Sequence, residues 1–357
     1  MKKNDYYDNQ ENRICQKTGK KYIDIYSSER KKETRSFRIS LSRILFCIFF
    51  VCIGLIGSMM IYAYMTLRSF NYETDFITQE DNINIQDNLN TEDLNSSNLI
   101  NDNMILNVLL IGSDSMSVGD GGRSDSILIL SVNMRTKKIK ITSIMRDTWV
   151  SIPGHSKDRI NASYAYGGCK SVIDTIHRNF GIYIDRYACV DFAGFSEIID
   201  SIGGIDMYLT EQECSYINKY SENKNNVLKI SSGVKHLTGT QALQHARNRN
   251  SIGSDYDRTT RQRQVIKSVI EKMKSANITE ITNLVSKLAP IVTTNFKQSE
   301  IGRLVLKALE YLKYNIEEFR IPTDDNVRNE IYSQKMVLVI NNMSKVIEDL
   351  KKFIYEY

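Results

Sequence analysis

The stretch ILNVLLIGSDSMSVGDGGRSDSILILSVNMRTKKIKITSI, residues 105–144, decides the fold class. Two segments of it, 105–111 and 126–133, are almost continuously apolar, and a third, 138–144, alternates in the manner of a half-buried strand. Continuous apolar runs are typical of strands buried on both faces, so the first two are expected near the centre of a sheet. The short connection 134–137 suits a hairpin between the second and third strands.

Helical and strand-like segments alternate through the rest of the chain. Apolar periodicity predicts helices at 162–180, 192–202, 238–247, 258–274, 278–292, 299–312 and 344–354, and further strands at 182–190, 205–209 and 318–321. Thr238 is the expected N-cap of its helix. This alternation predicts an α/β fold, a layered α/β/α sandwich around a central mixed β-sheet.

A long apolar segment precedes this domain. Residues 44–67, ILFCIFFVCIGLIGSMMIYAYMTL, carry no charge and are long enough to cross a bilayer as a helix. Basic residues lie before the segment and acidic residues after it, so the positive-inside rule places the N-terminus in the cytoplasm. A cleaved signal peptide is the alternative, but the apolar run is too long and starts too far into the chain. A single-pass signal-anchor in the cell membrane is therefore expected.

Composition divides the chain into four regions. We expect a basic cytoplasmic tail at 1–43, the transmembrane helix at 44–67, an acidic and polar extracytoplasmic tether at 68–103, and one extracytoplasmic domain at 104–357. The net charge of +5, from 47 basic and 42 acidic residues, is too small to indicate nucleic acid as a partner. Cys169, Cys189 and Cys214 do not form a disulfide framework, and the histidines lack the spacing of a zinc site.

Charged residues stand where the first three strands begin or end. If these strands are antiparallel neighbours, the end of the first, the start of the second and the end of the third share one sheet edge. That edge would carry Asp114, Asp125 and Arg146, with Arg123 within reach. Two carboxylates and a guanidinium suit a divalent cation that bridges to a phosphate. The alternative is that the aspartates cap turns and that Arg146 forms a surface pair with Asp147.

A second basic group consists of five arginines within seventeen residues: Arg247, Arg249, Arg258, Arg261 and Arg263. The planar guanidinium fork suits phosphate oxygens.

The helix from 258 onward bears an apolar stripe, formed by Val265, Ile266, Val269, Ile270 and Met273. Projected backward, the stripe passes through Arg258, Arg261 and Gln262, which predicts a polar pocket at the helix N-terminus, whereas Arg263 is expected on the surface. The sequence shows no nucleophile elbow, P-loop or dinucleotide fingerprint, so the pattern favours phosphoryl transfer.

The motifs that carry these residues resemble those of the LytR-CpsA-Psr family. They are NVLLIGSDS (107–115), GRSDSILILSVN (122–133), SIMRDTWVSIPG (143–154), DRINASYAYGG (158–168), VDFAGFSEIIDSIGGIDM (190–207), LTGTQALQHARNRN (237–250) and DYDRTTRQRQV (255–265). The match covers roughly 107–274 and follows the family's motif order behind a single-pass anchor.

The resemblance implies a phosphotransferase that moves a glycopolymer from an undecaprenyl-pyrophosphate carrier to peptidoglycan, at the 6-hydroxyl of N-acetylmuramic acid. Teichoic acids and capsular or other wall polysaccharides are the implied donors. Hydrolysis of the lipid pyrophosphate, and a non-enzymatic wall-sensing or regulatory module, remain alternatives.

The resemblance also implies residue roles. Mg²⁺, or Mn²⁺, would be held by Asp114 and Asp125. The pyrophosphate would be clamped by Arg123, Arg146, Arg247, Arg249 and Arg258, with Asp255, Arg261 and Gln262 close by. Arg159 stands where the family often has lysine, which keeps the charge but changes the donor geometry.

Overall fold

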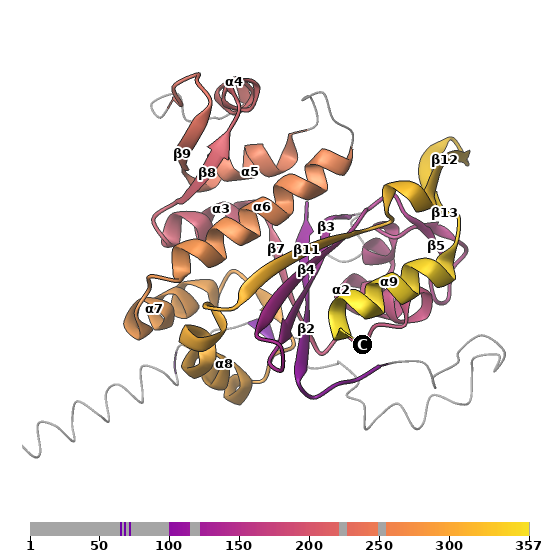
Figure 1. The fold of residues 1–357 in the computed structure, drawn as a ribbon, viewed down its shortest axis with the longest axis horizontal. Helices are drawn as coiled ribbons and strands as arrows, with labels where there is room; N and C mark the ends of the chain where they lie inside the picture. Colours follow the sequence, from indigo (N-terminus) through magenta and orange to yellow (C-terminus); the bar gives the residue numbers. More distant parts are fainter. Residues whose placement is uncertain are drawn as a thin grey trace, which may run out of the picture. The chain divides into compact units, whose positions relative to one another are not determined.

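A seven-stranded mixed sheet lies at the centre of the described structure (Figure 1). The structure, a computed structural model, describes residues 65, 68, 71–72, 100–114, 122–220, 227–248 and 255–356. Along the sheet the strands follow the order β1 (Asn71–Tyr72), β10 (Thr293–Thr294), β7 (Arg186–Asp191), β2 (Ile105–Ser113), β3 (Ser124–Asn133), β4 (Lys138–Ile144) and β11 (Asn315–Ile321).

The strands run in both directions. β2, β3 and β4 are antiparallel neighbours, whereas β7 is parallel to β2 and β11 is parallel to β4. The ends of β2, β4, β7 and β11 therefore meet the start of β3 at one edge of the sheet. The α/β class, the mixed sheet and the central position of the two apolar strands are confirmed.

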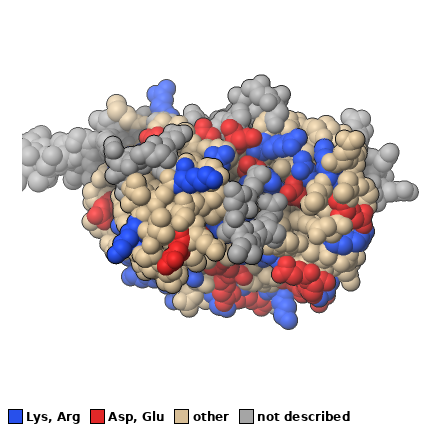
Figure 2. All heavy atoms as spheres, turned by 90° about the horizontal axis from the view of Figure 1, so that it is seen from above, with Lys and Arg blue, Asp and Glu red and all other residues tan. Residues whose placement is uncertain are grey.

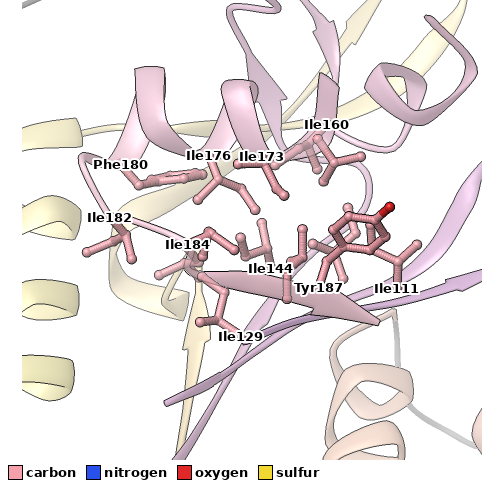
Figure 3. Packing of buried hydrophobic residues seen from close by; sticks show 14 of the residues in the cluster. Ile111, Ile129, Ile144, Ile160, Ile173, Ile176, Phe180, Ile182, Ile184 and Tyr187 are labelled. Carbon is pink, nitrogen blue, oxygen red and sulfur yellow. The ribbon is translucent and has the colours of Figure 1, made fainter. Parts of the chain in front are cut away.

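Two helices cover one face of the sheet, α2 (Ala162–Phe180) and α9 (Met343–Tyr355). In Figure 3, Ile173, Ile176 and Phe180 of α2 face side chains of the strands, among them Ile129 and Tyr187. Strand alternation explains this packing, because odd-numbered residues of β2 and β3 point to this face.

The opposite face is covered by α6 (Asp255–Met273), whose Ile266 and Ile270 pack against even-numbered residues of β3 such as Leu128 and Val132. The start of α6 lies close to the edge of the sheet where β3 begins. A helix thus brings its first turns to the sheet edge that carries the charged residues.

A second apolar cluster joins α6 to a smaller group of elements through Val265. This group comprises α3 (Phe192–Ser201), β8 (Ile205–Leu209), α4 (Glu211–Tyr220), β9 (Gly233–Leu237) and α5 (Gly239–Arg247). Thr238 caps α5 as expected: it accepts the N–H of Gln241, whose side chain accepts the N–H of Thr238 in return.

The remaining elements are α7 (Ile278–Leu288), α8 (Gln298–Tyr311), a short 3₁₀ helix η3 (Asp324–Asn326), and two small antiparallel pairs. β5 (Trp149–Val150) pairs with β6 (Asp158–Arg159), and β12 (Val327–Tyr332) pairs with β13 (Lys335–Ile340). Neither α4 nor β9 nor the β12–β13 hairpin was predicted. Cys169, Cys189 and Cys214 are buried free thiols.

The predicted tail, 1–43, and all of the predicted membrane span 44–67 except Met65 lie outside the described residues, as do most residues of the predicted tether. Seven residues of the predicted tether are described, 68, 71–72 and 100–103, and Asn71 and Tyr72 form β1 beside β10. Within the part of the chain that the structure describes, no helix is both long and apolar enough to span a membrane.

Candidate functional site

The candidate site is built around Asp125, which occupies a β-bulge. Gly112 pairs with Ser126 and Ser113 with Ser124, so Asp125 is an extra residue without a partner on β2. A bulge changes the direction in which a side chain points and is frequent beside functional sites. Here it lies at the sheet edge where β3 begins.

Two arginines from distant parts of the chain converge on the Asp125 carboxylate. Arg146 Nη1 donates to Oδ1 at 2.8 Å, and Arg258 Nη2 lies 3.3 Å from the same oxygen. Arg258 Nη2 also donates to the backbone carbonyl of Asp125 at 2.7 Å, and Gln262 Nε2 reaches that carbonyl at 3.5 Å. The predicted convergence of Asp125 and Arg146 at one sheet edge is therefore present, and the start of α6 joins it.

The carboxylate of Asp125 is held in its charged form. Burial alone would raise its pKa, but the guanidinium groups of Arg258 and Arg146 outweigh burial and lower the pKa below its ordinary value. Arg258 is the most deeply buried of the three side chains, with 4% of it exposed. The site thus combines an ionised acceptor with cations that are largely removed from water.

A second carboxylate links Arg146 to Arg159. Asp147 Oδ2 lies 3.3 Å from Arg146 Nε, and its Oδ1 accepts from Arg159 Nη1 at 3.0 Å. Arg159, on β6, is therefore not part of the pocket lining and orients Arg146 through the Asp147 carboxylate that both arginines share. Asp147 was weighed in the sequence only as a surface partner of Arg146, yet it is half-buried and belongs to the site.

These side chains border a small pocket that is partly open to solvent. Its lining residues are Asp125, Ile144, Met145, Arg146, Asp147, Arg258, Thr259 and Gln262. Charged groups of both signs are interspersed on the face shown in Figure 2. A pocket with two arginines and a shared carboxylate can take up an anion, because an incoming phosphate competes with Asp125 for the guanidinium groups.

Two other α6 arginines face away from the pocket. Arg261 is buried, as predicted, but it binds Glu213 Oε1 at 3.1 Å and the carbonyl of Asn248 at 3.0 Å. The surface position predicted for Arg263 is wrong, because Arg263 is 8% exposed and bonds Glu318 and Ser143. The prediction considered the apolar stripe alone, and the stripe contains no sign of a buried ion pair with β11.

The other predicted residues are placed as follows. Asp114 is exposed and accepts the backbone N–H of Arg123 at 2.9 Å. Arg247 stacks its guanidinium on the ring of Phe192, 4.5 Å from the ring centroid. Arg249 lies outside the described residues, and Asp255 is described only as the first residue of α6.

A divalent cation at Asp114 and Asp125 fits the donor set in part. Both ion pairs that the structure gives Asp125 end on Oδ1, and Asp114 lies at the same end of the β2–β3 ladder. Among the described residues, no group of three or more Asp, Glu, His or Cys side chains could enclose a metal. Mg²⁺ takes one or two carboxylates and completes its shell with water and phosphate oxygens, so Asp114 and Asp125 match the number of protein ligands that it requires.

Comparison with known proteins identifies relatives. Residues 60–352 match the model of the LytR_cpsA_psr family. The polyisoprenyl-teichoic acid–peptidoglycan teichoic acid transferase TagV of Bacillus subtilis is 34% identical over 200 residues, which cover 54% of this chain and 50% of TagV. The transferase of the same description named TagU, from Bacillus mycoides, is 33% identical over 61% of this chain and 69% of its own length. The chain thus spans about half of TagV and about two thirds of TagU.

Solved structures share the fold. The crystal structure of B. subtilis TagV matches with a TM-score of 0.58 and 27% identity, over 71% of this chain and 99% of that one. TagT, a LytR-CPS2A-psr family protein solved with bound octaprenyl pyrophosphate lipid, matches with a TM-score of 0.56 and 23% identity, over 72% and 95%. The family model covers the sheet, the arginine-bearing α6 and the hairpin together, and this chain belongs to the LytR_cpsA_psr family.

Proposed function

We propose that this protein is a transferase that moves a wall glycopolymer, a teichoic acid or a capsular or other polysaccharide, from undecaprenyl pyrophosphate to a hydroxyl of peptidoglycan. The observation that carries the proposal is the pocket in which Arg146 and Arg258 share Asp125. Family membership and the activity named for TagV and TagU support the same reaction.

Arg146 and Arg258 would bind the pyrophosphate oxygens through charge-assisted hydrogen bonds. Gln262 adds a neutral donor on the α6 side, and Asp147 with Arg159 keeps the guanidinium of Arg146 in place. Because these groups are held before the substrate arrives, they stabilise charge in the transition state with little reorganisation.

In the transfer step the acceptor oxygen forms a bond to the sugar-proximal phosphorus, and the bond from that phosphorus to the bridging oxygen breaks. The bridging oxygen leaves with undecaprenyl phosphate. The acceptor hydroxyl loses its proton in the same step, and the carboxylate of Asp125 in the pocket would accept it. Mg²⁺ bound by Asp125 and Asp114 would supply neutralising charge to the pyrophosphate.

We also propose that residues 44–67 anchor the domain on the outer side of the cell membrane, where both the lipid carrier and peptidoglycan are found. The uncharged length of that segment and the basic residues before it support this topology. Protease added to intact cells should digest the domain and leave a short N-terminal fragment in the membrane. If the domain resists digestion until the cells are opened, the topology is wrong.

The test of the activity is a reconstituted assay with a lipid-pyrophosphate-linked polymer and peptidoglycan. Arg146→Ala and Arg258→Ala should each lower polymer transfer by about 10²-fold or more, the usual loss for a group that contacts the transition state. Arg186→Ala is the matched control, because Arg186 is also a half-buried arginine in an ion pair, with Glu300. Arg186 is the first residue of β7, whereas the pocket lies at the sheet edge where β7 ends. Transfer at the wild-type rate in both pocket variants would refute the assignment.

The two alternative functions predict other outcomes of the same assay. A hydrolase would release polymer phosphate whether or not peptidoglycan is present, so product analysis with and without acceptor separates it from a transferase. A regulatory module would leave polymer attachment intact in an Asp114→Ala/Asp125→Ala variant.

A further inference from the structure

Two aromatic rings contact each other close to the pocket. Trp149 of β5 and Tyr332 of β12 have ring centroids 5.1 Å apart and planes tilted by 32°. Trp149 is half-buried and Tyr332 is 38% exposed. Arg146 precedes Trp149 by three residues, so their Cα atoms lie at most about 11 Å apart. The rings therefore form a partly exposed aromatic surface next to the groups that would bind the pyrophosphate.

The β12–β13 hairpin holds this surface in position. The N–H of Leu338 on β13 donates to the carbonyl of Asp147 at 2.9 Å. Lys335 Nζ bonds both oxygens of Asp158, at 3.0 and 3.3 Å. Figure 1 shows β5 beside β12 and β13. Because the hairpin bonds to the segment that follows Arg146, the aromatic surface and the pocket keep a fixed distance.

Polar groups lie along the same face of the hairpin. Strand alternation places Arg328, Glu330 and Tyr332 on one face of β12, and Ile331 on the other. Arg328 Nε donates to Glu330, and the Tyr332 hydroxyl also bonds Glu330. Aromatic rings bordered by a carboxylate and a guanidinium suit a pyranose ring, whose C–H face packs on aromatic carbon while its hydroxyls bond charged groups.

We infer that the Trp149–Tyr332 surface binds a sugar ring of the acceptor glycan strand, beside the sugar whose hydroxyl reacts. This inference rests on the proposed function. A polymeric acceptor extends in both directions from its reacting hydroxyl, so it needs surface beyond the pocket. β5 follows Asp147 of the pocket lining by two residues, and the hairpin bonds to Asp147, so both lie beside the site and offer the chemistry that a sugar ring requires.

The single tryptophan of the chain makes a direct test possible. We would titrate the full chain in detergent with a tetrasaccharide of alternating N-acetylglucosamine and N-acetylmuramic acid, without any donor, and follow tryptophan emission. The emission should change saturably. Tyr332→Ala should weaken the apparent affinity about tenfold, and Tyr332→Phe, which keeps the ring, should restore most of it. Ile331→Ala is the matched control, because Ile331 is the neighbouring exposed residue on the opposite face.

In the transfer assay, Tyr332→Ala and Trp149→Ala should raise the KM for peptidoglycan about tenfold while the KM for the lipid-linked donor stays constant. Emission that does not respond to the tetrasaccharide, or an equal effect of Ile331→Ala, would overturn the inference. So would emission that responds to undecaprenyl pyrophosphate and not to the tetrasaccharide.

The two proposals can fail separately. If the tetrasaccharide binds but the protein only hydrolyses the lipid-linked donor, the sugar-binding surface is supported and the transferase function is refuted. If the wild-type protein transfers polymer but its tryptophan emission does not respond to the tetrasaccharide, the transferase function is supported and the sugar-binding surface is refuted.

Discussion

Replacement of Asp125 by Asn should destabilise the free protein and, at the same time, make it respond more strongly to an added anion. The substitution keeps the size of the side chain and removes the charge that faces Arg146 and Arg258. Asp125 and Arg146 are about one-fifth exposed, at 21% and 19%, and Arg258 is 4% exposed. Arg258 would therefore lose the Asp125 carboxylate while almost completely out of water, and Arg146 would keep its pair with Asp147.

The size of the loss follows from this intermediate burial. An exposed ion pair contributes up to about 1 kcal/mol, and removal of one partner of a fully buried pair costs about 3–5 kcal/mol. We expect Asp125→Asn to lower the free energy of unfolding by about 2 kcal/mol, or the Tm by about 4–8 °C for a domain of this size. Asp325→Asn, which breaks an exposed pair with Lys345, is the control and should leave the Tm unchanged.

Inorganic pyrophosphate should reverse the effect. It would replace the lost carboxylate between the two guanidinium groups, and a hundredfold excess over its Kd adds about 2.7 kcal/mol to stability. Urea unfolding in EDTA, with and without pyrophosphate, measures the free energy of unfolding of wild type and variant and the increase that pyrophosphate gives to each. A variant that gains no more from pyrophosphate than wild type does would refute the view that Asp125 occupies the anion's position.

Three further outcomes test buried contacts of the fold. Burial lowers the pKa of His177 from its ordinary value of 6.5 to about 4, and its ring accepts a backbone N–H. Because the unfolded chain takes up a proton at a higher pH than the native state does, the native state should lose up to about 3 kcal/mol of stability as pH falls from 6.5 to 4. In His177→Gln, pH-dependent unfolding should show a shallower loss. Arg263→Met should lower the free energy of unfolding by about 2 kcal/mol, as urea titration would show, since Glu318 loses the guanidinium at 3.1 Å and is left with Lys267 at 3.9 Å. Gly239→Ala should cost about 3 kcal/mol, because a Cβ there would lie 1.9 Å from a backbone oxygen of α3, whereas Gly302→Ala, with open space around it, should raise the Tm slightly.

Local patterns predicted much of the fold. The bounds of β4, α2 and β8 agree with the predicted ranges because their apolar periodicity is strong and each has a turn or a glycine at one end. The kink inside α2 at Gly167 and Gly168 was not predicted. The β12–β13 hairpin was missed because Ile331 and Met336, its cross-strand pair, are exposed, and its buried face depends on contacts with residues far away in the sequence.

Part of the site was predictable because the ends and starts of antiparallel neighbouring strands lie at the same edge of a sheet. That rule brought Asp125 and Arg146 together, and the stripe on α6 added Arg258 and Gln262. Long-range ion pairs were beyond reach: Arg261 meets Glu213 and Arg263 meets Glu318, pairs that helical periodicity does not encode. The bulge at Asp125 was also missed, since an extra residue in a loop-to-strand junction leaves no mark on apolar alternation.

Because Asp125 is the extra residue of the bulge, it can be deleted without a change in the strand pairing of the sheet. Loss of the one codon for Asp125 would leave Ser124 opposite Ser113 and Ser126 opposite Gly112, a regular ladder with every later residue on its original face. Such a deletion would produce a domain that keeps its strands and lacks the group on which the two arginines converge. A single in-frame deletion is therefore a direct route to a folded domain without the shared carboxylate, in which the binding of pyrophosphate by the two arginines can be measured by itself.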